Sequence, residues 1–439
     1  MTTLTRYDAH CHIFTLRYVL KEAKSMLQAM VHQEYPWTKS GALMGAKSHT
    51  ELVANFRQTL VWLFELTSSA LTTERRNLDF LQRQACRAFP GDKLSIIPLM
   101  MDVFFILSYD LDKDEDIPAD FEAKSVFNSE ASVKEIWTDA LDGLREHVVS
   151  IGNEEFSKRE ALGMLSMNEV LNIVESERAV NGANGSLKSV SSSDYYHTEG
   201  FDYHMNNLMD LVYSRRGELY PFIAVDPRRR GMIETVMSGK FFTGSRRFYG
   251  VKLYPRLGYH PQCKPLMPLY KYCEDNGIPI TYHCGMSGFP PGTEWKWAQF
   301  GNPLNFEPIV KQFPNLRINF AHMGSSDPNH EWEQIVARLI NENPNVYTDL
   351  SCYTNFDELS SMRQYWDRSP SVQNRLMYGT DFDVMYYGGD KINMQEYMQN
   401  FKTIFGNNLV RMMVDNPKTF LGMEEQRLNC LQKILRRWF

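Results

Sequence analysis

The chain has 439 residues, of which 43% are hydrophobic and 23% charged, an ordinary balance for a globular protein with a large core. Its formal net charge of -6 gives no basic excess, which argues against nucleic acid or an anionic membrane as a partner. Its seven cysteines are scattered, with no CxxC pair, and the N-terminus lacks a signal-peptide pattern. We therefore expect a cytoplasmic protein without a disulfide scaffold.

Residues 7–14, Tyr-Asp-Ala-His-Cys-His-Ile-Phe, are expected to contain a short strand. Side chains alternate between the two faces of a strand, so His10 and His12 share a face and Cys11 points the other way. Two imidazoles on one face can bind one metal ion. For this stretch alone, a chance pair of histidines is an equally good interpretation.

The chain between this strand and about residue 215 is predicted to be mostly helical. Apolar residues at helical spacing predict helices at 18–30, 52–66 and 77–89, followed by a buried strand at 94–102. Further helices are predicted at 132–149, 157–176 and 203–215. The segment 179–193 is rich in Gly, Ser and Asn and is predicted to be a mobile loop.

From residue 220 onwards, predicted strands and helices alternate. The strands are expected at 220–226, 249–254, 279–283, 317–322, 346–350 and 376–381. Such alternation indicates parallel pairing, and with the two earlier strands the count reaches eight. We therefore predict an α/β fold, a (β/α)8 TIM barrel, as one domain over 1–439. Its long helical insertions after strands 1 and 2, at about 14–92 and 104–215, are expected to roof the C-terminal face.

Metal-binding residue types stand at the ends of several predicted strands. His10 and His12 end the first strand, and His283, His322 and Asp381 end the fifth, sixth and eighth. The C-terminal ends of barrel strands meet at one face and form the active site, so these side chains are expected to converge. Any one of them could be a buried structural residue, but that interpretation fits the whole set poorly.

These strand ends also resemble those of a known family. The His-x-His of the first strand, Thr281-Tyr282-His283, Phe320-Ala321-His322-Met323-Gly324 and Tyr378-Gly379-Thr380-Asp381 resemble the amidohydrolase superfamily. The closest resemblance is to its amidohydrolase 2 branch, which includes aminocarboxymuconate-semialdehyde decarboxylase, aromatic-acid decarboxylases, lactonases and hydratases. Segments 250–255 and 415–417 are also similar to that branch. The resemblance covers 1–13 and about 220–425, whereas 14–215 is not matched.

The resemblance implies that His10, His12, His283 and Asp381 bind one divalent metal ion, with zinc the expected metal. Imidazole and carboxylate donors suit zinc. Asp381 and His322 would be catalytic: Asp381 would accept a proton, and His322 would polarise a substrate carbonyl or move a proton. The leading hypothesis is a metal-dependent hydrolase in which a metal-bound water attacks a carbonyl of a small molecule, such as a lactone or amide.

Two other functions stay open at this point. The first is a non-oxidative decarboxylase of a small aromatic or unsaturated carboxylic acid, using the same metal. The second is a catalytically silent, metal-binding barrel that acts as a binding module through its long insertion. For an enzyme, the expected partner is a small-molecule substrate, and the sequence leaves a homodimer open.

Three residues on or just after the fourth strand are predicted to contact substrate. In some members of the superfamily a lysine at the position of Lys252 is carboxylated and bridges two metals. Contact with a substrate carboxylate, or with residues behind the metal ligands, is favoured here over a metal bridge, and neutralisation of nearby carboxylates is the alternative. Arg256 and His260 follow the strand closely, and a guanidinium group matches a carboxylate with two hydrogen bonds.

Two aspartates are predicted to orient a metal-binding histidine from behind. Asp102 ends the second strand and Asp226 ends the third, so both are near the expected centre. Asp226 precedes a proline and could instead start a turn. An anion clamp is also open among the arginines at 228, 229, 230, 246, 247 and 256, although most of these six are expected to be solvated.

Overall fold

The computed structural model describes residues 3–31, 49–67, 73–108, 110–117, 130–161, 165–178, 195–290, 296–325, 327–382 and 393–423. All eight predicted strands are present. They are β1 (Thr5–Cys11), β2 (Lys93–Pro98), β3 (Phe222–Ala224), β4 (Gly250–Leu253), β5 (Ile280–Tyr282), β6 (Ile318–Phe320), β7 (Val346–Asp349) and β8 (Leu376–Met377). Most are shorter than predicted, because the residues at the ends of the predicted ranges lie outside the paired part of each strand.

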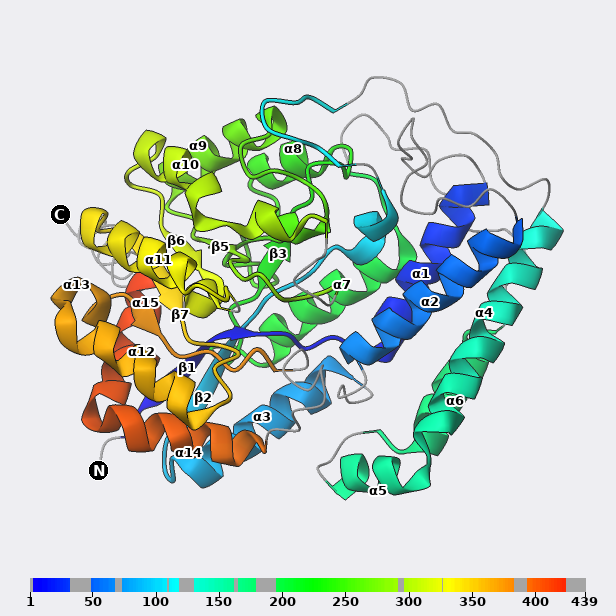
Figure 1. Ribbon diagram of the computed structural model, residues 1–439, viewed down its shortest axis with the longest axis horizontal. Helices are drawn as coiled ribbons and strands as arrows, with labels where there is room; N and C mark the ends of the chain where they lie inside the picture. The colour runs from blue at the N-terminus through cyan, green and yellow to red at the C-terminus, as the bar shows by residue number, and fades with distance from the viewer. Residues whose placement is uncertain are drawn as a thin grey trace, which may run out of the picture.

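The strands close into a barrel. β1 pairs with β2, and β3 to β8 pair in sequence order, always in parallel. Bridges from Ile96 to Leu219 and from Leu99 to Phe222 join β2 to β3. Where β1 meets β8, the Ala9 amide donates to the Tyr378 carbonyl, 2.8 Å away. The predicted (β/α)8 barrel is therefore confirmed (Figure 1).

In the described residues, the segments after β1 and β2 are mainly helical. Helices α1 (Leu16–Val31), α2 (His49–Thr67) and α3 (Glu74–Ala88) lie between β1 and β2. Helices α4 (Glu130–Ile151), α5 (Asn153–Ala161), α6 (Met167–Ser176) and α7 (Glu199–Ser214) lie between β2 and β3. The single helix predicted at 157–176 is instead two, since Ser166 and Glu169 form a capping box that starts α6. The loop predicted at 179–193 lies outside the described residues.

The remaining helices surround the sheet. They are α8 (Met232–Met237), α9 (Met267–Asn276), α10 (Glu307–Gln312), α11 (Glu331–Glu342), α12 (Phe356–Arg368), α13 (Pro370–Gln373), α14 (Met394–Phe405) and α15 (Asn416–Phe420). Their inner faces pack with the strands into the main hydrophobic core. Among the helices that the structure describes, none is both long and apolar enough to cross a membrane.

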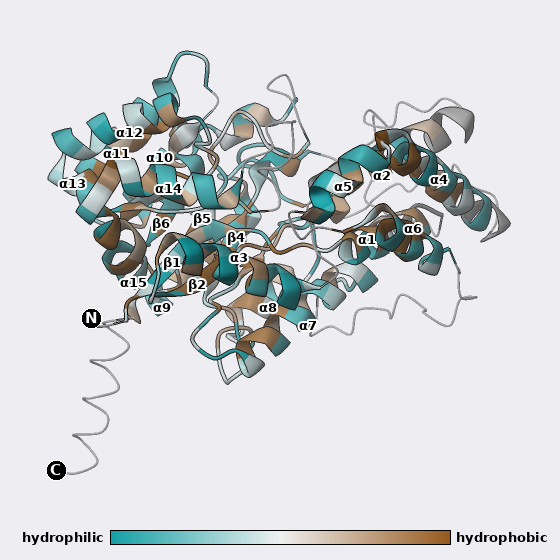
Figure 2. Cartoon of the chain, turned by 90° about the horizontal axis from the view of Figure 1, so that it is seen from below, coloured by the Kyte–Doolittle hydropathy of each residue, from teal (hydrophilic) through white to brown (hydrophobic). Residues whose placement is uncertain are grey.

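A second hydrophobic core lies in a helical lobe beside the barrel, formed by α1, α2, α4, α5 and α6 (Figure 2). Trp137 of α4 and Phe56 of α2 are fully buried in it. The same cluster includes Tyr254 and Leu257, which follow β4 at the C-terminal end of the barrel. The lobe thus reaches the barrel rim, while its position as a roof over that face stays a prediction.

A buried ionic network joins the lobe to the barrel. Arg229, after β3, donates from Nε to Asp102 Oδ2 at 2.6 Å and from Nη2 to Glu22 Oε1 of α1 at 3.1 Å. Burial raises the pKa of Glu22 to about 7, and Arg229 acts against that rise. Arg228 likewise binds Asp226, 2.6 Å from Nη2 to Oδ2. Arg228 and Arg229 are therefore among the arginines that are not solvated, because each neutralises a buried carboxylate.

We expect Arg229→Leu to lower the free energy of unfolding by about 3–5 kcal/mol, because it leaves two buried carboxylates without their counter-charge. Urea unfolding followed by circular dichroism measures the loss. Arg246→Leu is the matched control, since Arg246 pairs with Asp210 at the surface, and its effect should stay within about 1 kcal/mol. Equal losses for both variants would contradict the role given to the network.

Candidate metal centre

Three of the predicted metal ligands meet at the seam between β1 and β8. Nε2 of His10 and Nε2 of His12 each lie 3.2 Å from Oδ1 of Asp381. All three side chains are buried, and their ligand atoms lie within 4.8 Å of one another. His10 lies on β1 and His12 directly after it, and the chain after β8 brings Asp381 against both rings.

Both histidines are held from behind through Nδ1. His12 Nδ1 lies 2.7 Å from the Leu99 carbonyl, and His10 Nδ1 lies 3.1 Å from Asp349 Oδ2. Since neither oxygen carries a proton, we assign the ring proton to Nδ1 in both cases, which leaves a lone pair on each Nε2. Such an anchor is what metal-binding histidines ordinarily have.

When both rings are neutral, the atoms that face one another at this point are all proton acceptors. His10 Nε2 and Asp381 Oδ1 are buried and have no hydrogen-bond partner. Burial works to lower the pKa of His10, but Asp349 and Asp381 outweigh it and raise that pKa. The position therefore favours a positive charge, and a divalent cation fits the imidazole and carboxylate donors present.

His283, after β5, packs against His322, which in turn packs against His10. Its ring centre is 5.1 Å from that of His322, and it stacks on Tyr254 at 4.2 Å. Nε2 lies 3.2 Å from the Ser287 carbonyl, so Nε2 carries the proton, while the buried Nδ1 has no hydrogen-bond partner. Burial holds the pKa of His283 well below its usual value. A neutral ring with a free Nδ1 is suited to a metal ligand, although His283 is not in the close group of three.

His322 packs against His10, with ring centres 4.5 Å apart. Its Nδ1 lies 2.8 Å from Ser351 Oγ, and the Ser351 hydroxyl donates to Asp349. Ser351 Oγ must therefore accept from Nδ1–H of His322, which leaves Nε2 of His322 as a proton acceptor. Burial lowers the pKa of His322 to about 4, so the ring is neutral at pH 7.

Asp349 is the functional residue that sequence reasoning missed. Besides His10, its carboxylate accepts from Asn319 Nδ2 at 2.7 Å and from the Ser351 hydroxyl. Burial works to raise the pKa of Asp349, but His10, His322 and the hydrogen bond from Ser351 hold it well below its usual value. A signal was present, because Asp349 lies at the end of a predicted strand, as the predicted ligands do.

Asp102 and Asp226 do not have the role predicted for them. Their carboxylates bind Arg229 and Arg228, as described above, and Asp349 and the Leu99 carbonyl orient the histidines instead. The prediction that either aspartate orients a ligand histidine is therefore corrected.

Lys252 lies on β4, close to this centre. Its Nζ is buried and has no hydrogen-bond partner among the described residues. Burial lowers the pKa of Lys252 to about 8, and the nearby carboxylates of Asp381 and Asp349 act against the decrease. The amine is thus available for a new partner with negative charge.

Arg256 and His260 form hydrogen bonds with nearby backbone groups. The Arg256 guanidinium donates to the Met286 carbonyl at 2.6 Å and from Nε to the Pro290 carbonyl at 3.0 Å. It therefore holds the loop after β5. His260 packs edge-on against Phe300, and its Nδ1 accepts from the Gln262 amide. Both residues thus have structural partners, and their contact with substrate stays a prediction.

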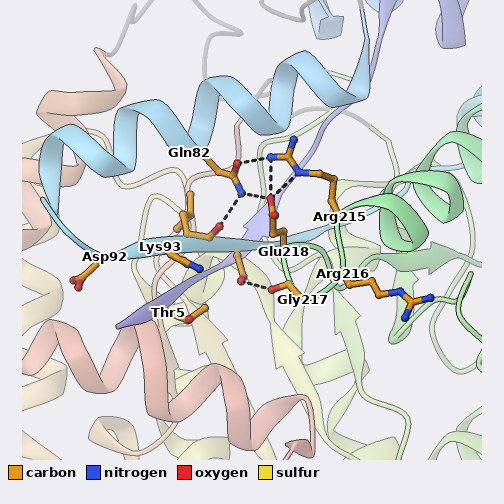
Figure 3. A pocket seen from close by; sticks show the side chains of 10 residues that line it. Thr5, Gln82, Asp92, Lys93, Arg215, Arg216, Gly217 and Glu218 are labelled. Carbon is orange, nitrogen blue, oxygen red and sulfur yellow. Dashed lines mark hydrogen bonds and ion pairs between the residues drawn. The ribbon is translucent and has the colours of Figure 1, made fainter. Parts of the chain in front are cut away.

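A pocket of about 420 Å³ lies at the opposite, N-terminal end of β1 and β2, where Thr5 and Lys93 line it (Figure 3). Arg215 also lines this pocket, and it donates to Glu218 and Gln82, each at 2.9 Å. None of the predicted site residues lines it. At this end of a barrel such interactions serve stability, so the pocket is separate from the candidate centre.

Comparison with known proteins supports the resemblance stated above. Residues 199–397 match the family model described as Amidohydrolase (Amidohydro_2), a segment that includes His283, His322 and Asp381. The resemblance is confirmed there, and it marks the chain as an enzyme related to the amidohydrolases. The match begins after His10 and His12. No curated protein matches the chain.

Several solved structures are similar in part. A TIM-barrel protein from Bordetella bronchiseptica is 20% identical with a TM-score of 0.39, covering 50% of this chain and 72% of its own. A probable 2-pyrone-4,6-dicarboxylic acid hydrolase from Acinetobacter baumannii is 13% identical with a TM-score of 0.38, covering 49% and 78%. The 5-carboxyvanillate decarboxylase from Sphingomonas paucimobilis is 14% identical with a TM-score of 0.36, covering 50% and 72%. Because these structures match only about half of this chain, at low sequence identity and low TM-score, they support no inference about its activity.

We expect Asp349→Asn to weaken metal binding by roughly 10–100-fold, since the carboxylate that fixes the His10 ring becomes an amide. Competition with a chromogenic chelator measures the affinity. Asp226→Asn removes the same charge from a strand end that the structure places outside the centre, and it should leave metal affinity unchanged. If Asp226→Asn weakened binding and Asp349→Asn did not, the corrected assignment would be wrong.

Proposed function

We propose that this protein is a metal-dependent hydrolase of a small-molecule carbonyl compound. His10, His12, His283 and Asp381 would hold one divalent ion, with zinc the expected metal. The main observation in support is that His10 Nε2 and His12 Nε2 each lie 3.2 Å from Asp381 Oδ1, and that all three are acceptors when both rings are neutral. A cation between them would relieve that repulsion.

When bound, an ion of this kind acts as a Lewis acid and brings the pKa of a water molecule near neutrality. Asp381 would accept a proton during the attack on the carbonyl. His322 would take up that proton from Asp381 at Nε2 and deliver it to the leaving group. To polarise a carbonyl, His322 would need its proton on Nε2. The hydrogen bond from Nδ1 to Ser351 instead favours the tautomer with the proton on Nδ1.

Lys252 favours a second candidate function, decarboxylation at the same centre. Its buried Nζ without a hydrogen-bond partner is suited to pairing with a carboxylate on the substrate. A small aromatic or unsaturated carboxylic acid would supply that group. The alternative of a silent binding module requires a gap in the ligand set. The grouping of His10, His12 and Asp381, with the His283 ring beside that of His322, argues against such a gap.

We further propose that the protein works in the cytoplasm. Cysteines 11, 86, 263, 273, 284 and 352 of the described residues are all free thiols, which suits a reducing compartment.

His283→Ala and His322→Ala should separate binding from chemistry. We expect His283→Ala to lose the metal, because it removes a ligand, and His322→Ala to keep the metal but lose activity by roughly 10²–10⁴-fold. Elemental analysis of the purified variants gives the metal content. His330→Ala changes an exposed histidine and should alter neither quantity. Loss of the metal from His322→Ala would show that the two roles were assigned wrongly.

A screen of lactones, amides and aromatic or unsaturated carboxylic acids would decide between the two reactions. Hydrolysis releases acid, whereas decarboxylation releases carbon dioxide, and both can be followed on the same substrate. We expect acid release as the main outcome.

The wild-type protein should contain close to one metal ion per chain after metal-replete expression. Less than about half an equivalent, without recovery on addition of zinc, would contradict both reactions, because a catalytic centre of this type needs its ion.

A further inference from the structure

The loop after β5, residues 285–290, packs against the ring of His283. The Ser287 carbonyl of this loop lies 3.2 Å from His283 Nε2, and a carbonyl oxygen can only accept a hydrogen bond. The proton on Nε2 leaves the lone pair on Nδ1, which is buried and has no hydrogen-bond partner among the described residues. The position of one loop carbonyl therefore decides which nitrogen of His283 is available to the proposed ion.

Gly288 of the loop lies against the same ring. Its φ of +147° is in the region that favours glycine, and a Cβ atom there would lie 2.9 Å from His283 Nε2 and 2.7 Å from the Tyr254 hydroxyl oxygen. The Tyr254 ring stacks on the His283 ring, with ring centres 4.2 Å apart. The loop and Tyr254 thus enclose the imidazole so closely that a side chain at position 288 has no room.

Two residues that follow β4 hold this loop in place. The Tyr254 hydroxyl oxygen accepts from the Phe289 amide at 2.8 Å. Arg256 is fully buried and donates from Nη1 to the Met286 carbonyl at 2.6 Å, and from Nε and Nη2 to the Pro290 carbonyl at 3.0 and 2.5 Å. One guanidinium group therefore connects the two sides of the loop.

We propose that Arg256 is a positioning residue for His283. By holding both sides of the loop, it fixes the Ser287 carbonyl, which keeps the His283 proton on Nε2 and the lone pair on Nδ1. This inference rests on the proposed function, in which His283 binds the ion. It gives Arg256 a role that needs no contact with the ion or with a substrate.

The tautomer of His283 can be measured without any metal. In the metal-free, full-length protein with ¹⁵N-labelled histidine, NMR distinguishes a protonated from an unprotonated ring nitrogen, and His283→Ala identifies the His283 signals. We expect the wild-type protein to carry the proton on Nε2. Arg256→Lys keeps the positive charge, but one ammonium group cannot replace the fork that reaches both carbonyls, so we expect a mixture of the two tautomers.

Zinc affinity, measured by competition with a chromogenic chelator, is the second readout. We expect Arg256→Lys to weaken zinc binding by roughly 10–100-fold, because a ligand is no longer held in its binding tautomer. Arg375→Lys is the matched control, since Arg375 directly precedes β8 and also donates to two backbone carbonyls, those of Pro344 and Ser371. This control should keep the wild-type tautomer of His283 and the wild-type zinc affinity.

Gly288→Ala covers the case in which Arg256→Lys does not fold. The added methyl group would displace the His283 ring or the loop, so we expect a mixed tautomer and weaker zinc binding here too. Gly91→Ala is its control, because Gly91 also has a positive φ, while an added Cβ there meets no described atom within 4 Å beyond its chain neighbours. Gly91→Ala should therefore change neither readout.

A wild-type tautomer together with wild-type zinc affinity in Arg256→Lys would overturn the proposal and leave substrate contact as the predicted role of Arg256. An equal loss of affinity in Arg375→Lys would overturn it as well, since the effect would then not depend on the loop. If the wild-type protein bound no zinc, the proposed function would fail, and the comparison of tautomers would still decide whether Arg256 fixes the His283 ring.

Discussion

The seam between β1 and β8 is the constraint on which the candidate centre depends. The buried Asp8 carboxylate accepts from the Thr380 amide at 3.0 Å and from the Thr380 hydroxyl at 2.6 Å. The Asp381 amide donates to the His10 carbonyl at 2.8 Å. These bonds fix residues near the two ends of the chain in one register, so that His10 and His12 meet Asp381. A slip at this seam would separate the ligands while leaving each strand intact.

Asp349 connects the two chemical parts of the centre. It holds the His10 ring directly, and through the Ser351 hydroxyl it sets which nitrogen of His322 carries the proton. One carboxylate therefore orients a proposed metal ligand and a proposed proton acceptor together. Because Asn319 also donates to it, Asp349 stays charged in a buried place, and its substitution would disturb both parts at once.

The sequence predicts the barrel and the convergence at its C-terminal ends because both follow from local pattern. Strand alternation sets the face of His10 and His12, and parallel order sets which ends meet. The roles of single polar residues depend on partners that are distant in sequence. Asp102 has the right type and strand end to orient a histidine, but its partner is Arg229, 127 positions away. Arg256 has the right chemistry for a carboxylate, yet the loop carbonyls that occupy it depend on the fold after β5.

The helical lobe, which the family resemblance does not cover, is linked to the metal centre through a few residues after β2. The Leu99 carbonyl accepts from His12, and two residues later the Met101 carbonyl accepts from the Tyr18 hydroxyl of α1 at 2.5 Å. Asp102, the next residue, is held by Arg229, which also binds Glu22 of α1. The short segment 99–102 is thus fixed by His12 on one side and by the lobe on the other. A shift of α1 would therefore be transmitted to the ring of a proposed metal ligand, which makes the lobe part of the centre's support as well as a candidate wall for its substrate.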